Sequence, residues 1–167
     1  MSLLCGKVVV FTVFHIVFHN VKGLDDMLSG TYQHNIDPKG RVAIPSKLRG
    51  ALGDCFVISK PIDKQPCLCV FPMNVWEELT EKIATLKLAQ ARAVRRYLYS
   101  GAVNTVLDSQ GRVLLPQSLR DFIGGAPGDS LTLVGADDCI EIWKTSDWEA
   151  LDIDAQQDDV LEILGEI

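Results

Sequence analysis

Two short segments combine an aspartate with an arginine four positions later, and they are the parts of this chain best suited to chemistry. The first runs from Asp37 to Arg41 and the second from Asp108 to Arg112. An arginine guanidinium is a planar fork of donors that can grip a phosphate or the O6 and N7 edge of guanine. The aspartate can orient that fork for a ligand or simply clamp the turn, and the spacing leaves both interpretations open. Either way, the segments favour binding over catalysis.

The two segments belong to an internal repeat with an offset of 71 positions. Further along the chain the offset becomes 72, where Trp76 matches Trp148. A fixed period indicates a duplicated structural unit, so we expect two related halves that present two similar loops. Residues of the first copy that have an identical residue 71 positions later include Gly30, Asp37, Gly40, Arg41, Pro45, Leu48 and Arg49.

The residues needed for catalysis are sparse. The histidines are His15, His19 and His34, and the sequence has no Gly-x-Ser-x-Gly, P-loop or His-Glu-x-x-His pattern. Asp37 and Asp108 could face each other like the paired carboxylates of an aspartic protease. Because each has an arginine four residues on, we expect both to stay ionised rather than to share a proton. We therefore predict that the protein is not an enzyme and has no catalytic residues. The alternative is a hydrolase that uses the two aspartates.

The net charge of −6 hides an uneven distribution. From Ser146 onward there are eight acidic residues and no Lys or Arg, which leaves 16 basic and 14 acidic residues before that point. The acidic end suits a solvated tail, with DNA mimicry or self-inhibition as alternatives. Arg120 lies just after the second motif and is a further basic residue of the repeat. The basic residues that we predict to contact DNA lie in or just after the two motifs: Lys39, Arg41, Lys47, Arg49 and Arg112.

Each motif is expected to form a β-hairpin whose turn ends in a glycine. Gly40 and Gly111 can take positive φ without steric cost, and Asp37 and Asp108 can accept hydrogen bonds from turn amides, so these four residues are predicted to be structural. Helical turns should follow Pro45 and Pro116, and one longer helix should separate the halves. The strand-like runs are 31–36, 41–44, 55–59, 67–71, 102–107, 112–115, 130–134 and 139–143, and the helical turns span 46–52 and 117–123.

The first 26 residues of the chain stand apart from the rest of the sequence. Residues 1–26 differ in composition from the rest, and their apolar run over 8–18 is shorter than the roughly 20 residues that span a bilayer. We interpret 1–26 as a leader or a mis-assigned start, with an extra strand or an export signal as alternatives.

The cysteines predict neither a metal site nor a disulfide scaffold, and this fits a reduced cytoplasm. The cysteines are Cys5, Cys55, Cys67, Cys69 and Cys139.

The two motifs together resemble the MraZ family. The runs 37–45, Asp-Pro-Lys-Gly-Arg-Val-Ala-Ile-Pro, and 108–116, Asp-Ser-Gln-Gly-Arg-Val-Leu-Leu-Pro, match its doubled Asp-x-x-x-Arg signature. The resemblance extends from Met27 to about Trp148. It implies an α+β, mainly β fold: a tandem, pseudo-twofold, AbrB-like swapped-hairpin barrel with helices after each half. The family's members are bacterial transcriptional regulators that assemble into rings and bind direct repeats upstream of the division and cell-wall gene cluster, usually including their own gene.

Carried over to matching residues, the resemblance gives Arg41 and Arg112 the signature arginine positions and Asp37 and Asp108 the aspartates. It implies a cytoplasmic, nucleoid-associated homo-oligomer on double-stranded DNA, with no cofactor, small-molecule substrate or membrane partner. An AbrB-like antitoxin is the nearer alternative, although that class normally carries one motif per chain. The expected organisation is a leader, a first AbrB-like repeat with its connecting helix, a second repeat and an acidic tail: 1–26, 27–98, 99–150 and 151–167.

Overall fold

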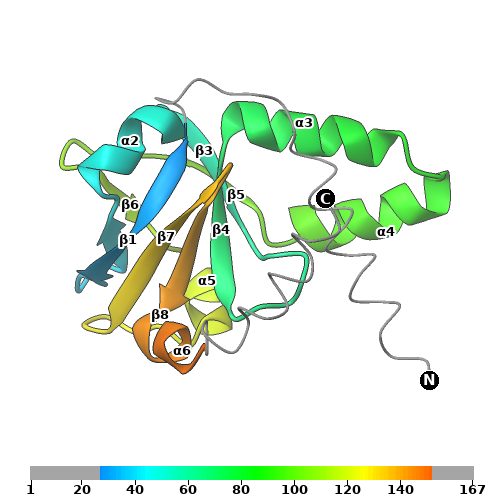
Figure 1. Cartoon of the computed structure of the whole chain (residues 1–167). Coiled ribbons are helices and arrows are strands. Elements are labelled where there is room, and N and C mark those ends of the chain that lie inside the picture. The colour runs from blue at the N-terminus through cyan, green and yellow to red at the C-terminus, as the bar shows by residue number, and fades with distance from the viewer. Residues whose placement is uncertain (1–26, 152–167) are drawn as a thin grey trace, which may run out of the picture.

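The structure is a computed structural model that describes residues 27–151 (Figure 1). The segments 1–26 and 152–167 lie outside the described residues, and with them lie the predictions for the leader and for nearly all of the acidic tail. Between these limits the chain is mixed α and β, with strands dominating the central body, as the sequence predicts.

The main sheet has six strands, and every neighbouring pair is antiparallel. The two sequence repeats interleave in it, because β1 of the first copy pairs with β7 of the second and β5 of the second pairs with β3 of the first. Each repeat therefore completes its part of the sheet with a strand of the other. In spatial order the strands are β1 (Leu28–Asn35), β7 (Ser130–Asp137), β8 (Ile140–Lys144), β4 (Cys67–Pro72), β3 (Cys55–Ser59) and β5 (Val103–Val106).

A two-stranded ribbon joins the repeats a second time. It consists of β2 (Arg41–Ala43) and β6 (Arg112–Leu114), which run antiparallel with Val42 opposite Val113. Both valines are fully buried, so the inward side of the ribbon belongs to the core. Backbone hydrogen bonds extend the pairing beyond the strands, from Ile44 N–H to the Gly111 carbonyl at 2.9 Å and from Leu115 N–H to the Gly40 carbonyl at 3.0 Å.

The predicted pairing of the two hairpins is wrong. Both turns form, but among the described residues no ladder joins β1 to β2 or β5 to β6. Strands of three residues bury few side chains alone, and each gains a partner with the same apolar alternation by meeting the equivalent strand of the other repeat. The described strands also form an open sheet ending at β1 and β5, with no closed barrel.

Short helices follow each ribbon strand, as the sequence predicts. α2 (Ser46–Leu52) begins after Pro45, and α5 (Gln117–Phe122) begins after Pro116. Proline suits a helix start because its missing N–H is not needed there. α6 (Thr145–Ala150) ends the second repeat.

The single long helix predicted between the repeats is instead a pair. α3 (Met73–Ala84) and α4 (Leu88–Tyr99) fold back on each other on the side of the molecule opposite the ribbon (Figure 1). A straight helix would carry its second half away from the sheet, whereas the turn lets α4 bury Ala91 and Leu98. Leu86 lies in the turn between the two helices and is 42% exposed. No helix within 27–151 has the length and apolar character to cross a membrane.

Candidate nucleic-acid interface

Each motif loop is built around its aspartate. In the first loop, Asp37 Oδ1 accepts the backbone N–H groups of Lys39 and Arg41, both at 2.9 Å. In the second, Asp108 Oδ1 accepts those of Gln110 and Arg112 at the same distances. The glycines close both turns with positive φ, 81° at position 40 and 73° at position 111. The predicted structural roles of the aspartates and glycines fit this geometry.

The second oxygen of each aspartate holds an arginine and links the two loops. Arg41 Nε lies 2.7 Å from Asp37 Oδ2, and Arg112 Nε lies 2.9 Å from Asp108 Oδ2. The arginines also reach across the repeat boundary, since Arg41 Nη1 is 3.6 Å from Asp108 Oδ2 and Arg112 Nη1 is 3.9 Å from Asp37 Oδ2. We call these four residues the charge cluster. It connects two loops that lie 71 positions apart in the sequence.

The charge cluster favours ionised carboxylates. Hydrogen bonding from the Arg41 backbone N–H is the leading cause that lowers the pKa of Asp37, and the Arg41 side chain adds to it. The corresponding bonds from Arg112 lower the pKa of Asp108 to about 2. Two carboxyls that share a proton would instead have one pKa raised. The electrostatics therefore do not suit the hydrolase alternative, in which the two aspartates act as an acid and a base.

The two arginines of the charge cluster are fixed by the aspartates but stay partly exposed to solvent. Their side chains keep 25% of their surface exposed at Arg41 and 26% at Arg112. This arrangement combines the two interpretations of the sequence, because the clamp fixes a guanidinium that still faces solvent. A preoriented donor fork at a fixed position is suited to bind a phosphate or a guanine edge.

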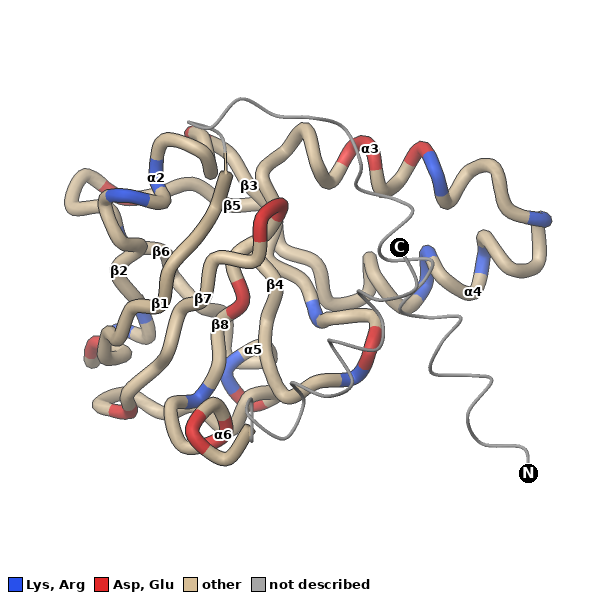
Figure 2. The backbone as a smooth tube through the Cα atoms, viewed as in Figure 1, with Lys and Arg blue, Asp and Glu red and all other residues tan. Residues whose placement is uncertain are grey.

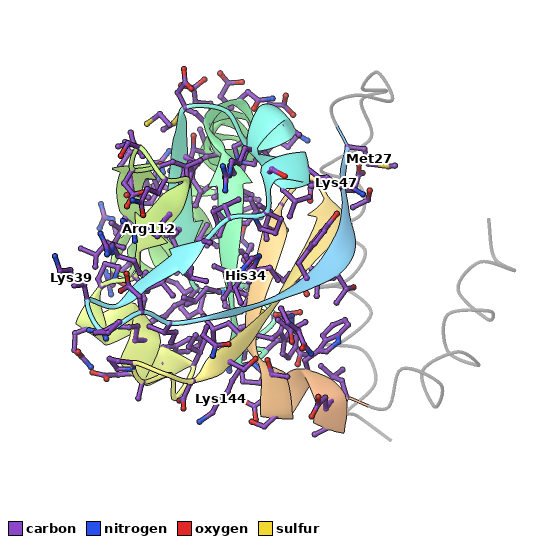
Figure 3. All side chains as sticks on the ribbon, turned by 90° about the vertical axis from the view of Figure 1, so that its left-hand side faces the viewer. Met27, His34, Lys39, Lys47, Arg112 and Lys144 are labelled. Carbon is purple, nitrogen blue, oxygen red and sulfur yellow. The ribbon has the colours of Figure 1, made fainter. Side chains whose placement is uncertain are left out.

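The other predicted contact residues occupy three different settings. Lys39 is exposed at the tip of the first loop and extends away from the body, whereas Lys47 lies on the other side of the view beside Met27 (Figure 3). Arg49 is half-buried, and its Nε donates to the Ile44 carbonyl at 2.7 Å. The structure thus brings Lys39 close to the charge cluster along the chain, separates Lys47 from the loop tip, and turns Arg49 toward the ribbon backbone.

Two residues near the ribbon were not among the predicted contacts. Arg120 is the repeat equivalent of Arg49 and packs beside Gly40, a relation that the offset of 71 could have indicated. Leu114 is 53% exposed because the alternation of β6 turns it outward from the buried Val113. Leu114 lies directly opposite Arg41 in the antiparallel ribbon.

A second group of basic residues lies far from these loops. Figure 2 shows basic positions along α4, on the side of the molecule opposite the ribbon. Within the described part of the chain, no group of three His, Cys, Asp or Glu residues is arranged to hold a metal ion. We define the candidate nucleic-acid interface as the two motif loops, the ribbon and the charge cluster.

Comparisons with known proteins match most of the chain. The family model described as "MraZ protein, putative antitoxin-like" matches residues 27–96 and 98–162. A protein of Roseiflexus sp. (strain RS-1) named "Transcriptional regulator MraZ" is 42% identical over 125 residues, which cover 74% of this chain and 85% of that protein. A protein of Thermoanaerobacter pseudethanolicus with the same name is 39% identical over 145 residues, covering 84% of this chain and 99% of the relative. Both repeats and both motif loops lie within the matched region.

Proposed function

Because this chain belongs to the MraZ family, whose relatives above are named transcriptional regulators, we propose that it is a sequence-specific DNA-binding regulator without catalytic activity. The observation that carries the proposal is the charge cluster, which ties two arginine-bearing loops into one surface. Two loops fixed relative to each other can meet DNA with a set spacing, so specificity follows from geometry as well as from side-chain identity.

The proposed contacts divide between reading and anchoring. Arg41 and Arg112 present guanidinium groups from the ribbon, and a two-stranded ribbon has the dimensions that the major groove admits. If either arginine binds a guanine in bidentate fashion, the contact contributes about 1 to 3 kcal/mol of discrimination. Lys39 contacts a phosphate from the loop tip, and Lys47 contacts a more distant phosphate. Such lysine contacts add salt-dependent affinity rather than sequence information.

We further propose that the protein acts as a homo-oligomer, a ring in keeping with the family resemblance, on direct repeats upstream of the division and cell-wall gene cluster and its own gene. One subunit offers a small contact surface, so it should bind a single DNA box weakly. Linking several such surfaces raises the overall affinity by about 100 to 10,000-fold when their spacing matches the boxes. The same proposal includes an AbrB-like swapped-hairpin organisation and a cytoplasmic, nucleoid-associated location.

A gel-shift titration tests the proposal with the DNA immediately upstream of the protein's own gene. The wild-type protein should shift this DNA more tightly than a scrambled sequence of equal length, and Arg41→Ala should remove that preference. Lys87→Ala is the matched control, because it also removes one positive charge. Lys87 directly precedes α4, which lies on the side of the molecule opposite the ribbon. Equal affinity of wild type and Arg41→Ala for both DNAs, with both proteins folded, would contradict the proposal.

A further inference from the structure

Arg49 and its repeat equivalent Arg120 each pack against the motif glycine of the other repeat. A Cβ placed on Gly111 would overlap Cζ, Nη1 and Nη2 of Arg49. A Cβ placed on Gly40 would come within 2.8 Å of Arg120 Cζ and 2.9 Å of its Nη1. The bare glycine backbone thus makes room for a guanidinium in both loops. This requirement is separate from the positive φ of the two glycines.

The Arg49 contact lies at the boundary where the repeats join. Its Nε donates to the Ile44 carbonyl at 2.7 Å, while the N–H of Ile44 donates to the Gly111 carbonyl at 2.9 Å. The side chain of Arg49 therefore contacts both segments of this junction, Ile44 by a hydrogen bond and Gly111 by packing. Arg49 belongs to α2, which follows β2 in the chain, and its guanidinium reaches the turn of the second loop.

We propose that Arg49 and Arg120 are positioning residues that hold each DNA-facing loop in place from the opposite repeat. Arg49 braces the turn at Gly111, and Arg120 braces the turn at Gly40. The inference rests on the proposed DNA-binding function for its biological meaning, but the bracing itself can be measured without DNA. It assigns Arg49 a role different from the direct DNA contact that its sequence position predicts.

The two braces are not equivalent. Arg120 Nη2 donates to Gln117 Oε1 at 2.6 Å, but its buried Nε has no hydrogen-bond partner. Arg49 uses the equivalent Nε to bind a backbone carbonyl. Because an unpaired buried donor weakens the packing that contains it, the brace on the first loop should be the weaker of the two. Removing Arg49 should therefore loosen its target loop more than removing Arg120 loosens the other.

Amide hydrogen exchange of the full chain tests the bracing directly. In Arg49→Met, which retains an apolar stem, exchange at Gly111 and Arg112 should rise at least about tenfold, since their turn loses its packing partner. Exchange at Gly40 should rise less. Arg120→Met should give the reverse pattern with a smaller increase. Unchanged exchange at the opposite loop in both folded variants would overturn the proposal.

The conservative variant Arg49→Lys separates bracing from a direct phosphate contact. A lysine keeps the charge but lacks the planar fork, so it should fail to restore slow exchange at Gly111. In DNA titrations, Arg49→Met should weaken binding without changing the slope of affinity against salt. A slope reduced by about 0.9, with loop exchange unchanged and affinity rescued by Arg49→Lys, would make Arg49 a direct phosphate contact and overturn the proposal.

Glycine variants provide a second test that does not remove either arginine. Gly111→Ala and Gly53→Ala both place an alanine at positive φ, 73° and 78°, but a Cβ at Gly53 meets no atom within 4 Å. Only Gly111→Ala should displace Arg49, so the ribbon amide of Ile44 should exchange faster in that variant alone. Equal effects of the two substitutions there would contradict the brace. If the bracing results hold but the wild type binds no DNA, the proposed function fails while this inference stands.

Discussion

The two motif loops share a framework and differ at their tips. In both, an aspartate accepts two backbone N–H groups and binds an arginine four residues later, at distances that agree within 0.2 Å because the Nε contacts measure 2.7 Å and 2.9 Å. The tip residues are Pro38 and Lys39 in the first loop but Ser109 and Gln110 in the second. Duplication has thus kept the residues that build the loop and changed those that face outward.

This difference separates construction from recognition. The charge cluster needs one aspartate and one arginine from each repeat, so both loops should be equally necessary for the shape of the surface. The positive charge at the tip belongs to the first loop alone, where Lys39 stands in place of Gln110. We therefore expect the first loop to supply more of the salt-dependent affinity and the second to orient the protein on DNA.

The largest effect should come from the buried residues that follow the ribbon strands. Ile44 and Leu115 are repeat equivalents and both are fully buried. Replacing either by alanine should lower the free energy of unfolding by about 2 to 5 kcal/mol, because each substitution leaves a cavity where the repeats meet. Leu114→Ala is the control and should cost less than about 0.5 kcal/mol, since this side chain is 53% exposed. Denaturant unfolding measures the free energy of unfolding of all three variants. Unequal losses for Ile44→Ala and Leu115→Ala would show that the two repeats do not contribute equally to the junction.

The next effect concerns the aspartates. Asp37→Ala and Asp108→Ala each remove the acceptor of two backbone N–H groups and the partner of both arginines. Losing hydrogen bonds to a charged group should reduce DNA affinity by about 100-fold or more in either variant. Anisotropy titration gives the affinities, and circular dichroism checks the fold. If one variant retained wild-type affinity, the loops would not depend on a shared cluster.

The pH dependence should be confined to acid conditions. The pKa of Asp108 falls from 3.8 to about 2 in the folded protein, and that of Asp37 is also lowered. A lowered folded-state pKa means that the unfolded chain binds more protons, so this contribution to stability is present above about pH 4 and is lost as the pH falls toward 2. Carboxyl chemical shifts followed by NMR should show both aspartates ionised at pH 5. An apparent pKa above 4 at either residue would contradict the hydrogen-bonded geometry.

The smallest effect should be an exchange of tip residues. Lys39→Gln should weaken DNA binding by about 3 to 10-fold and lower the salt slope by about 0.9, the change expected for one lost phosphate contact. Gln110→Lys should change both quantities in the opposite direction. Equal responses to Lys39→Gln and to the distant Lys87→Ala would show that Lys39 acts only through net charge.

The local elements could be read from the sequence, because their signals are local. The helices after Pro45 and Pro116 begin where proline predicts, and the apolar runs 55–59 and 67–71 become β3 and β4. The partner of each strand could not be derived in the same way. A turn between two extended runs predicts a hairpin, but the apolar alternation of β2 and β6 is satisfied equally well by pairing between repeats.

The candidate site shows the same division. The spacing of aspartate and arginine predicts a contact within one loop, and the structure shows it in both. The cross-contacts at 3.6 Å and 3.9 Å depend on the antiparallel ribbon, which sequence spacing alone does not reveal. Arg49 illustrates the consequence, since its charge predicts a DNA contact whereas its surroundings show a backbone partner in the ribbon.

The most direct test of the account is a map of the DNA-bound surface by amide hydrogen exchange. The exchange is recorded on the full chain with and without the DNA immediately upstream of the protein's own gene. We predict protection in both motif loops, 37–41 and 108–112, with no change along α4 on the opposite side of the molecule (Figure 1). Protection of α4, with both loops unaffected at saturating DNA, would contradict the claim that the linked loops form the DNA-binding surface.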